Sequence, residues 1–170
     1  MKKIIILSLI ISLAAACDLD KFPADQIEKS QSLQTVEDAK QFNNAMYVHL
    51  RNRIYGIYMF SEDVQADLYN ASIDFGNRNG SIYRWSFVSS DYTFRDTWRY
   101  YYAAIANINN FIDNVDNVNA STEKDANTLK LYKGEAYLLR AFYYFQLTKK
   151  FCKAYDPSTA AGTMGLPLVT

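Results

Sequence analysis

The residue with the most distinctive chemical setting is Cys17, which directly follows an apolar segment near the start of the chain. Lys2 and Lys3 are basic, and the thirteen residues 4–16 are apolar or small. This order is typical of an export signal, and a thiol placed after the small residues can be acylated before a peptidase cleaves there. Residues 1–16 are therefore predicted to be a lipoprotein signal peptide, with Cys17 as the lipidated N-terminus.

The same segment leaves one alternative open. Leu13 lies four residues before Cys17, so that Ala14 occupies the position where the usual lipoprotein pattern has leucine. An ordinary signal peptide cleaved near Ala16 also fits. In either case the apolar run is shorter than the ~20 residues that span a bilayer, so any membrane attachment is predicted to come from a lipid anchor.

Composition and spacing argue against several other function classes. Without residues 1–16 the chain carries 16 basic and 18 acidic residues, and these are interspersed, whereas nucleic-acid binding needs a concentrated basic surface. Apart from Cys17 the only cysteine is Cys152, and the single histidine, His49, is far from it. We therefore predict no nucleic-acid partner, no disulfide framework and no metal site, and we interpret His49 as an ordinary surface histidine.

Catalysis is not predicted either. Glycoside hydrolysis needs two carboxylates facing each other across a cleft, but Glu62, Asp63 and Asp67 lie close together in one short segment. The sequence contains no nucleophile elbow, zinc-binding helix motif or phosphate loop. We expect a protein that is not an enzyme and uses no cofactor.

The elements that would position these groups begin after a polar stretch, 17–34, which is predicted to be a tether. Thr35 and Asp38 have the spacing of a capping box, and apolar residues then recur three or four apart, so a helix is predicted over 35–52. A shorter helix is predicted over 59–69, with Ser61 as its cap.

The stretch 70–93 is rich in Asn, Ser, Gly and aromatic residues, which are typical of turns. The alternation of rings in 82–88 favours a brief extended segment, with these three on one side: Tyr83, Trp85 and Phe87.

Two long helices are predicted next, over 94–116 and 122–150, joined by a short Asn-rich loop as an antiparallel hairpin. The apolar face of the first steps by three or four residues through Trp98, Tyr101, Ile105, Ile108, Ile112 and Val115. The second is apolar nearly all round over 136–147, so several neighbours must cover it. Its Ala141 and Phe145 match a step at which tetratricopeptide helices pack closely. Glu135 and Arg140 are interpreted as a satisfied polar pair or as contacts between helices, and not as catalytic groups.

Taken together, these features resemble the N-terminal part of the SusD/RagB family of nutrient-binding outer-membrane lipoproteins. The resemblance extends over essentially the whole chain, because order and spacing agree throughout. The matching pieces are Cys17-Asp18-Leu19-Asp20 with Pro23, Asp38-Ala39, Asp67, the run from Trp98 to Asp113, the run from Gly134 to Phe145, and Gly165-Leu166-Pro167-Leu168-Val169.

The resemblance implies a mainly all-α fold of tetratricopeptide-like helical hairpins, with an irregular loop segment rich in aromatic residues and asparagine. Family members are several times longer, so residues 35–170 are expected to be an incomplete N-terminal helical domain. It further implies a surface-exposed outer-membrane lipoprotein that binds glycans, or peptides, and delivers them to a SusC-like TonB-dependent transporter.

Ligand-binding residues are expected in the segment 67–85, because residues from this stretch contribute to the ligand surface in the family. Aromatic faces and planar polar groups suit sugars, and the candidates are Asp67, Arg84 and Trp85, with Tyr83 and Asn79. The alternative is a structural helical-repeat lipoprotein that mediates protein contacts, in which these rings only pack against the helices. Exposure of the rings would favour ligand binding, and burial would favour the structural role.

Overall fold

The computed structural model describes residues 32–169, and Leu33 onward forms one compact unit in which no strand is described. The predicted signal peptide, Cys17 and nearly all of the predicted tether lie outside the described residues. The elements are α2 (Val36–His49), η2 (Leu50–Ile54), α3 (Ile57–Gln65), η3 (Ile73–Phe75), α4 (Gly80–Tyr83), α5 (Tyr92–Asn114), η4 (Val115–Asn117), α6 (Glu123–Phe151) and η5 (Ala160–Gly162). The all-α prediction is confirmed.

Helix α2 starts as its sequence predicts. The Thr35 hydroxyl accepts a hydrogen bond from the Asp38 backbone N–H at 3.2 Å, and the Asp38 carboxylate accepts one from the Thr35 N–H at 2.9 Å, which completes the capping box. A hydrogen bond of the Thr35 side chain to the Asp38 carboxylate is the main reason that the pKa of Asp38 is lowered, and the bonds from the backbone N–H groups of Thr35 and Gln34 add to it. The helix then widens into the π-helical turn η2 and ends at Tyr55, whose backbone is extended.

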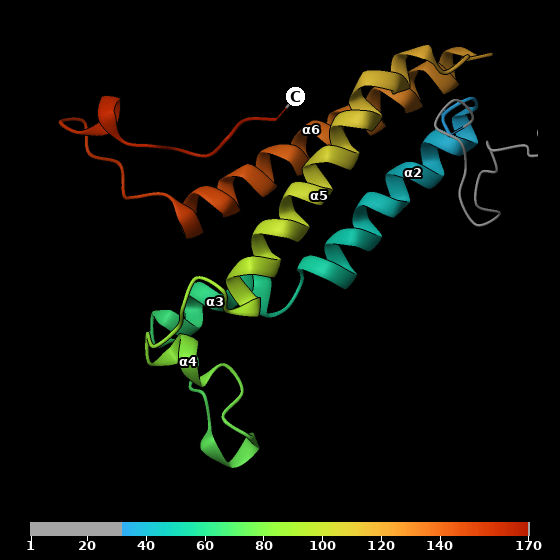
Figure 1. Cartoon of the computed structure of the whole chain (residues 1–170). Coiled ribbons are helices and arrows are strands. Elements are labelled where there is room, and N and C mark those ends of the chain that lie inside the picture. Colours follow the sequence, from blue (N-terminus) through green and yellow to red (C-terminus); the bar gives the residue numbers. More distant parts are fainter. Residues whose placement is uncertain (1–31, 170) are drawn as a thin grey trace, which may run out of the picture. The chain divides into compact units, whose positions relative to one another are not determined.

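The core lies where α5 and α6 pack side by side and α2 lies along both (Figure 1). The predicted hairpin is therefore confirmed. Every residue of the predicted α5 face is buried except Trp98, which is partly exposed. Tyr101 of α5 meets Tyr143 of α6 edge to face, with ring centres 5.5 Å apart, and both side chains are fully buried.

The tetratricopeptide-type contact expected of Ala141 and Phe145 is not formed. Both residues are exposed, because the face of α6 that packs against α5 and α2 carries a different set: Leu129, Ala136, Leu139, Tyr143 and Leu147. The expectation that several neighbours must cover 136–147 is met only in part: α5 and α2 pack against α6 and Tyr144 bonds Val169, but one side of the helix stays open. Its other side presents Leu131, Leu138 and Phe145.

Of the two alternatives for the polar residues embedded in α6, the structure shows contacts between helices. The Glu135 carboxylate accepts hydrogen bonds from the Asn43 amide at 2.7 Å and the Tyr47 hydroxyl at 3.2 Å, which ties α6 to α2. The Arg140 guanidinium donates to the Asn109 side-chain oxygen at 2.9 Å, which ties α6 to α5.

Two predictions are wrong in the region that joins α2 to α5. Ser61 does not cap a helix, because α3 begins four residues earlier, directly after Gly56 with its φ of 108°. Ser61 lies within α3, and its side chain is buried. Residues 82–88 are not extended, because the short helix α4 occupies Gly80–Tyr83. The ring alternation there reflects a turn of helix followed by an irregular loop. We call residues 57–91, which include α3 and α4, the lobe.

Candidate functional site

The lobe is held against α6 by a buried lysine. The Lys150 ammonium donates hydrogen bonds to the Met59 carbonyl and the Ser61 hydroxyl at 3.1 Å each and to the Glu62 carboxylate at 2.9 Å. Lys149 also pairs with Glu62. Since the Lys150 side chain is only 4% exposed, this cluster is the main polar attachment of α3 to α6.

The charged groups in this cluster shift each other's pKa values. Burial lowers the pKa of Lys150, and the hydrogen bond and charge of Glu62 oppose that shift. Partial burial by itself would raise the pKa of Glu62, but the hydrogen bonds and charges of Lys149 and Lys150 outweigh it, so the pKa is lowered. Glu62 is therefore a carboxylate near neutral pH, and it is engaged with cations.

Trp85 presents its ring to solvent. The side chain is 65% exposed, yet its indole N–H donates to the Gln65 carbonyl at 3.0 Å, and its ring centre lies 6.1 Å from that of Phe87. Its φ of 55° is left-handed, which is rare for a residue with a side chain. The ring is thus both accessible and fixed at its polar edge.

Trp85 lines a hollow of about 720 Å³ at the contact of the lobe with α5 and α6. Other aromatic residues surround it, and the ring centres of Phe87 and Phe94 are 4.3 Å apart. The lining also carries the polar ends of the lysine cluster. It comprises Ser61, Glu62, Gln65, Trp85, Phe87, Val88, Ser89, Phe94, Arg95, Trp98, Lys149, Lys150 and Phe151.

Three of the predicted residues form hydrogen bonds within the lobe: Tyr83 with Asp67, and Arg84 with Asn77. A hydrogen bond to Asp67 and the charge of that carboxylate raise the pKa of Tyr83. The Arg84 guanidinium donates to the Asn77 side-chain oxygen at 3.1 Å. Asp67 and Asn77 also have left-handed backbones, with φ of 63° and 52°, so polar side chains lock the turns of this segment.

Asn79 lies at a second hollow of about 540 Å³ on the lobe. Its φ is 63°, and it immediately precedes the first residue of α4. The exposed ring of Tyr69 lines the same hollow, as do the side chains of Asn70 and Arg78. This hollow therefore combines an aromatic face with amide and guanidinium groups.

The five predicted ligand-binding residues do not share one cavity. Trp85 lines the first hollow and Asn79 the second, whereas Asp67, Tyr83 and Arg84 line neither. All five belong to the 67–85 segment, but three of them serve its internal hydrogen bonds. Of the predicted set, Trp85 and Asn79 are the residues placed at a concave surface.

Periodicity does not indicate the helix residues that complete the Trp85 hollow. It places Trp98 on the buried face of α5, but this side chain is partly exposed and meets Phe151 of α6 edge to face, with ring centres 5.1 Å apart. Phe94, one turn earlier on α5, also lines the hollow. Their four-residue spacing in the sequence is the pattern that could have indicated a second aromatic side of α5.

The chemistry available at the two hollows is stacking and hydrogen bonding. Exposed rings can lie against apolar C–H faces, while amides, guanidinium groups and the partly exposed Lys149 can bind hydroxyl oxygens. Lys150 does not contribute, because its three N–H groups are already bonded within the protein. Among the described residues, no three His, Cys, Asp or Glu side chains are grouped as they would be to hold a metal ion. Within the same part of the chain, no helix has the length and apolar character needed to cross a membrane.

Comparison with known proteins gives one match. No curated protein and no solved structure matches the chain. A family model does match it over residues 19–167, that of the SusD-like family described as starch-binding and associating with the outer membrane. This match covers nearly all of the chain, so the protein belongs to that SusD-like family.

Proposed function

We propose that the protein binds oligosaccharides at the outer membrane, with Trp85 as a stacking platform. The observation that carries this proposal is the exposed indole of Trp85, fixed by its bond to Gln65 and set in an aromatic hollow that the partly exposed Lys149 also lines. A ring held in this way offers a flat apolar face to a sugar, with hydrogen-bond donors beside it. The family description, starch-binding, supports a glucan as the ligand.

We further propose that Cys17 carries a lipid, that the protein faces the outside of the cell, and that it passes its ligand to a SusC-like TonB-dependent transporter. These steps rest on the N-terminal sequence pattern and the family, since both Cys17 and the predicted signal peptide lie outside the described residues. Binding is the role proposed here, and no catalytic step is assigned.

The test is the affinity of the full chain for soluble starch or malto-oligosaccharides, measured by calorimetry with Trp85→Ala. A stacked ring contributes ~1 kcal/mol beyond area burial, so this change is expected to weaken binding about fivefold or more. Tyr155→Ala is a matched control, because Tyr155 is 82% exposed but lines neither hollow. If the two variants bound the oligosaccharide with equal affinity, Trp85 would have a structural role and no part in binding.

One observation favours the second candidate function, a structural helical lipoprotein that mediates protein contacts. The open side of α6 exposes Leu131, Leu138 and Phe145 at seven-residue steps, which places them along one line of the helix. Large exposed apolar surfaces are typical of contact sites. Loss of transporter association on changing Leu138 to Glu, with starch affinity unchanged, would favour this function over glucan binding.

A further inference from the structure

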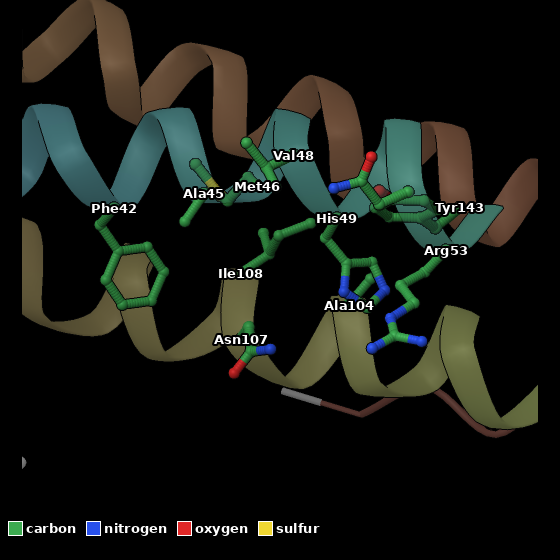
Figure 2. Close-up of a pocket in the computed structure, with 11 residues that line it drawn as sticks. Phe42, Ala45, Met46, Val48, His49, Arg53, Ala104, Asn107, Ile108 and Tyr143 are labelled. Carbon is green, nitrogen blue, oxygen red and sulfur yellow. The ribbon is translucent and has the colours of Figure 1, made fainter. Parts of the chain in front are cut away.

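A third cavity, of about 720 Å³, lies between α2, with its π-helical end η2, and α5 (Figure 2). It shares no lining residue with the two hollows of the lobe. Its size is in the ordinary range for small-molecule sites. The apolar part of its wall is formed by Phe42, Ala45, Met46, Val48, Ala104 and Ile108.

The polar part of the wall is formed by basic and amide side chains. Arg53 and Asn52 come from η2, His49 from α2 and Asn107 from α5. No aspartate or glutamate lines the cavity, and within the described residues Arg53 has no carboxylate partner. The cavity therefore offers a cation whose charge no neighbouring acid neutralises.

Tyr100 of α5 positions the two basic side chains. The His49 Nε2 lies 3.2 Å from the Tyr100 carbonyl oxygen, and since a carbonyl only accepts, this nitrogen must carry the proton. The Arg53 guanidinium lies over the Tyr100 ring, 5.7 Å from its centre. Wide π-helical turns are frequent at functional sites, and here such a turn brings Arg53 to the rim of an apolar cavity.

Tyr143 of α6 forms part of the inner wall of this cavity. Its side chain is fully buried, and its hydroxyl, which has no hydrogen-bond partner within the described residues, has almost no accessible surface. A ligand in the cavity therefore does not reach this hydroxyl. The feature that points to a ligand is Arg53, an exposed cation beside an apolar wall with no acid among the lining residues.

From these features we infer that the cavity binds a small monocarboxylate with an apolar body. The carboxylate pairs with Arg53, and the apolar body lies against the Phe42 and Ile108 side of the wall. This site is separate from the proposed glucan surface and does not depend on it.

The test uses 4-phenylbutyrate as the probe, titrated into the full chain by calorimetry, with the uncharged 4-phenylbutanamide beside it. The acid is expected to bind more tightly than the amide. Because a hydrogen bond to a charged group contributes about 1.5 kcal/mol or more, Arg53→Gln is expected to weaken binding of the acid roughly tenfold. Arg51→Gln is the matched control, since Arg51 is exposed on the same turn but does not line the cavity.

Three results would overturn the proposal: no heat of binding at millimolar probe, equal affinity for acid and amide, or equal effects of the Arg53 and Arg51 changes in variants with wild-type circular dichroism.

Discussion

The backbone of Trp85 is unusual for a bulky residue. A φ of 55° brings the side chain of an L-residue close to its own backbone, and such conformations persist only when neighbouring contacts hold them. Here the contact is the hydrogen bond from the indole to the Gln65 carbonyl. The residue with the strained backbone is therefore also the one with the exposed ring, as expected for a side chain that contacts a ligand.

Two substitutions at Trp85 separate backbone strain from loss of the ring. Both Trp85→Ala and Trp85→Gly remove the indole, but only glycine adopts a positive φ freely. We expect the glycine variant to be more stable than the alanine variant by ~1 kcal/mol, measured by urea unfolding. Both should lose starch affinity to the same extent. An alanine variant as stable as the glycine variant would mean that the left-handed backbone stores no strain.

The pairing of Glu62 with Lys149 and Lys150 predicts sensitivity to acid. The folded-state pKa of Glu62 is below its ordinary value of 4.5, so its contribution to stability is present above about pH 4.5 and is lost as pH falls through the lower folded value. We expect the free energy of unfolding to fall with decreasing pH in that window. In Glu62→Gln the same titration should be flatter, and an identical slope would show that other carboxylates dominate.

At the scale of elements, the sequence predicted helices well where local chemistry decides them. Thr35 with Asp38 caps the helix that its spacing predicts, and Thr122 with Asp125, which has the same spacing, caps α6. It failed where tertiary contacts decide. Ser61 has the type of a cap residue, but it is buried against Lys150 because α3 starts at the turn around Gly56.

In the candidate site too, the features that the sequence did not predict are those that tertiary contacts decide. Periodicity alone could not show that Trp98 turns partly outward, since its place on the α5 face is the same as that of the buried Tyr101. Nor could it indicate that Asp67 and Tyr83, which are sixteen residues apart, form a hydrogen bond with each other. The exposure of Trp85 depends on the left-handed turn that follows α4, which no short motif marks.

The open side of α6 leads to a prediction for that element. Leu131, Leu138 and Phe145 are each at least 60% exposed along one line, so the chain by itself should bind a hydrophobic dye and associate in solution. Leu138→Glu should reduce both, without loss of stability, because Leu138 packs against little. Leu139→Glu is the contrasting variant: this neighbour is buried and its change should unfold the chain. Unchanged dye binding in Leu138→Glu would place the apolar surface elsewhere.

At the scale of the whole described unit, two parts differ in how they are held. The apolar cluster spans α2, α5 and α6 and buries large side chains such as Tyr101, Phe111 and Tyr143. The lobe has few buried residues beyond Ser61, Val64 and Ile82, and Lys150 is its principal polar attachment to α6. Parts with few buried apolar contacts open at lower free energy than the core, so the proposed glucan surface belongs to the less stable part.

Hydrogen exchange of the full chain tests this division. Amides of α3 and α4 are expected to exchange faster than those of the buried face of α5, and Lys150→Met should accelerate the lobe further. Removing the charged hydrogen bonds of Lys150 costs about 1.5 kcal/mol or more, which corresponds to at least a tenfold faster exchange in the lobe, with the α5 amides little changed. Lys153→Met is the control, because Lys153 is exposed and lines none of the three cavities. If the lobe and α5 instead exchanged together, and Lys150→Met accelerated both equally, the lobe and the core would unfold as one cooperative unit, and the glucan surface would share the full stability of the helices.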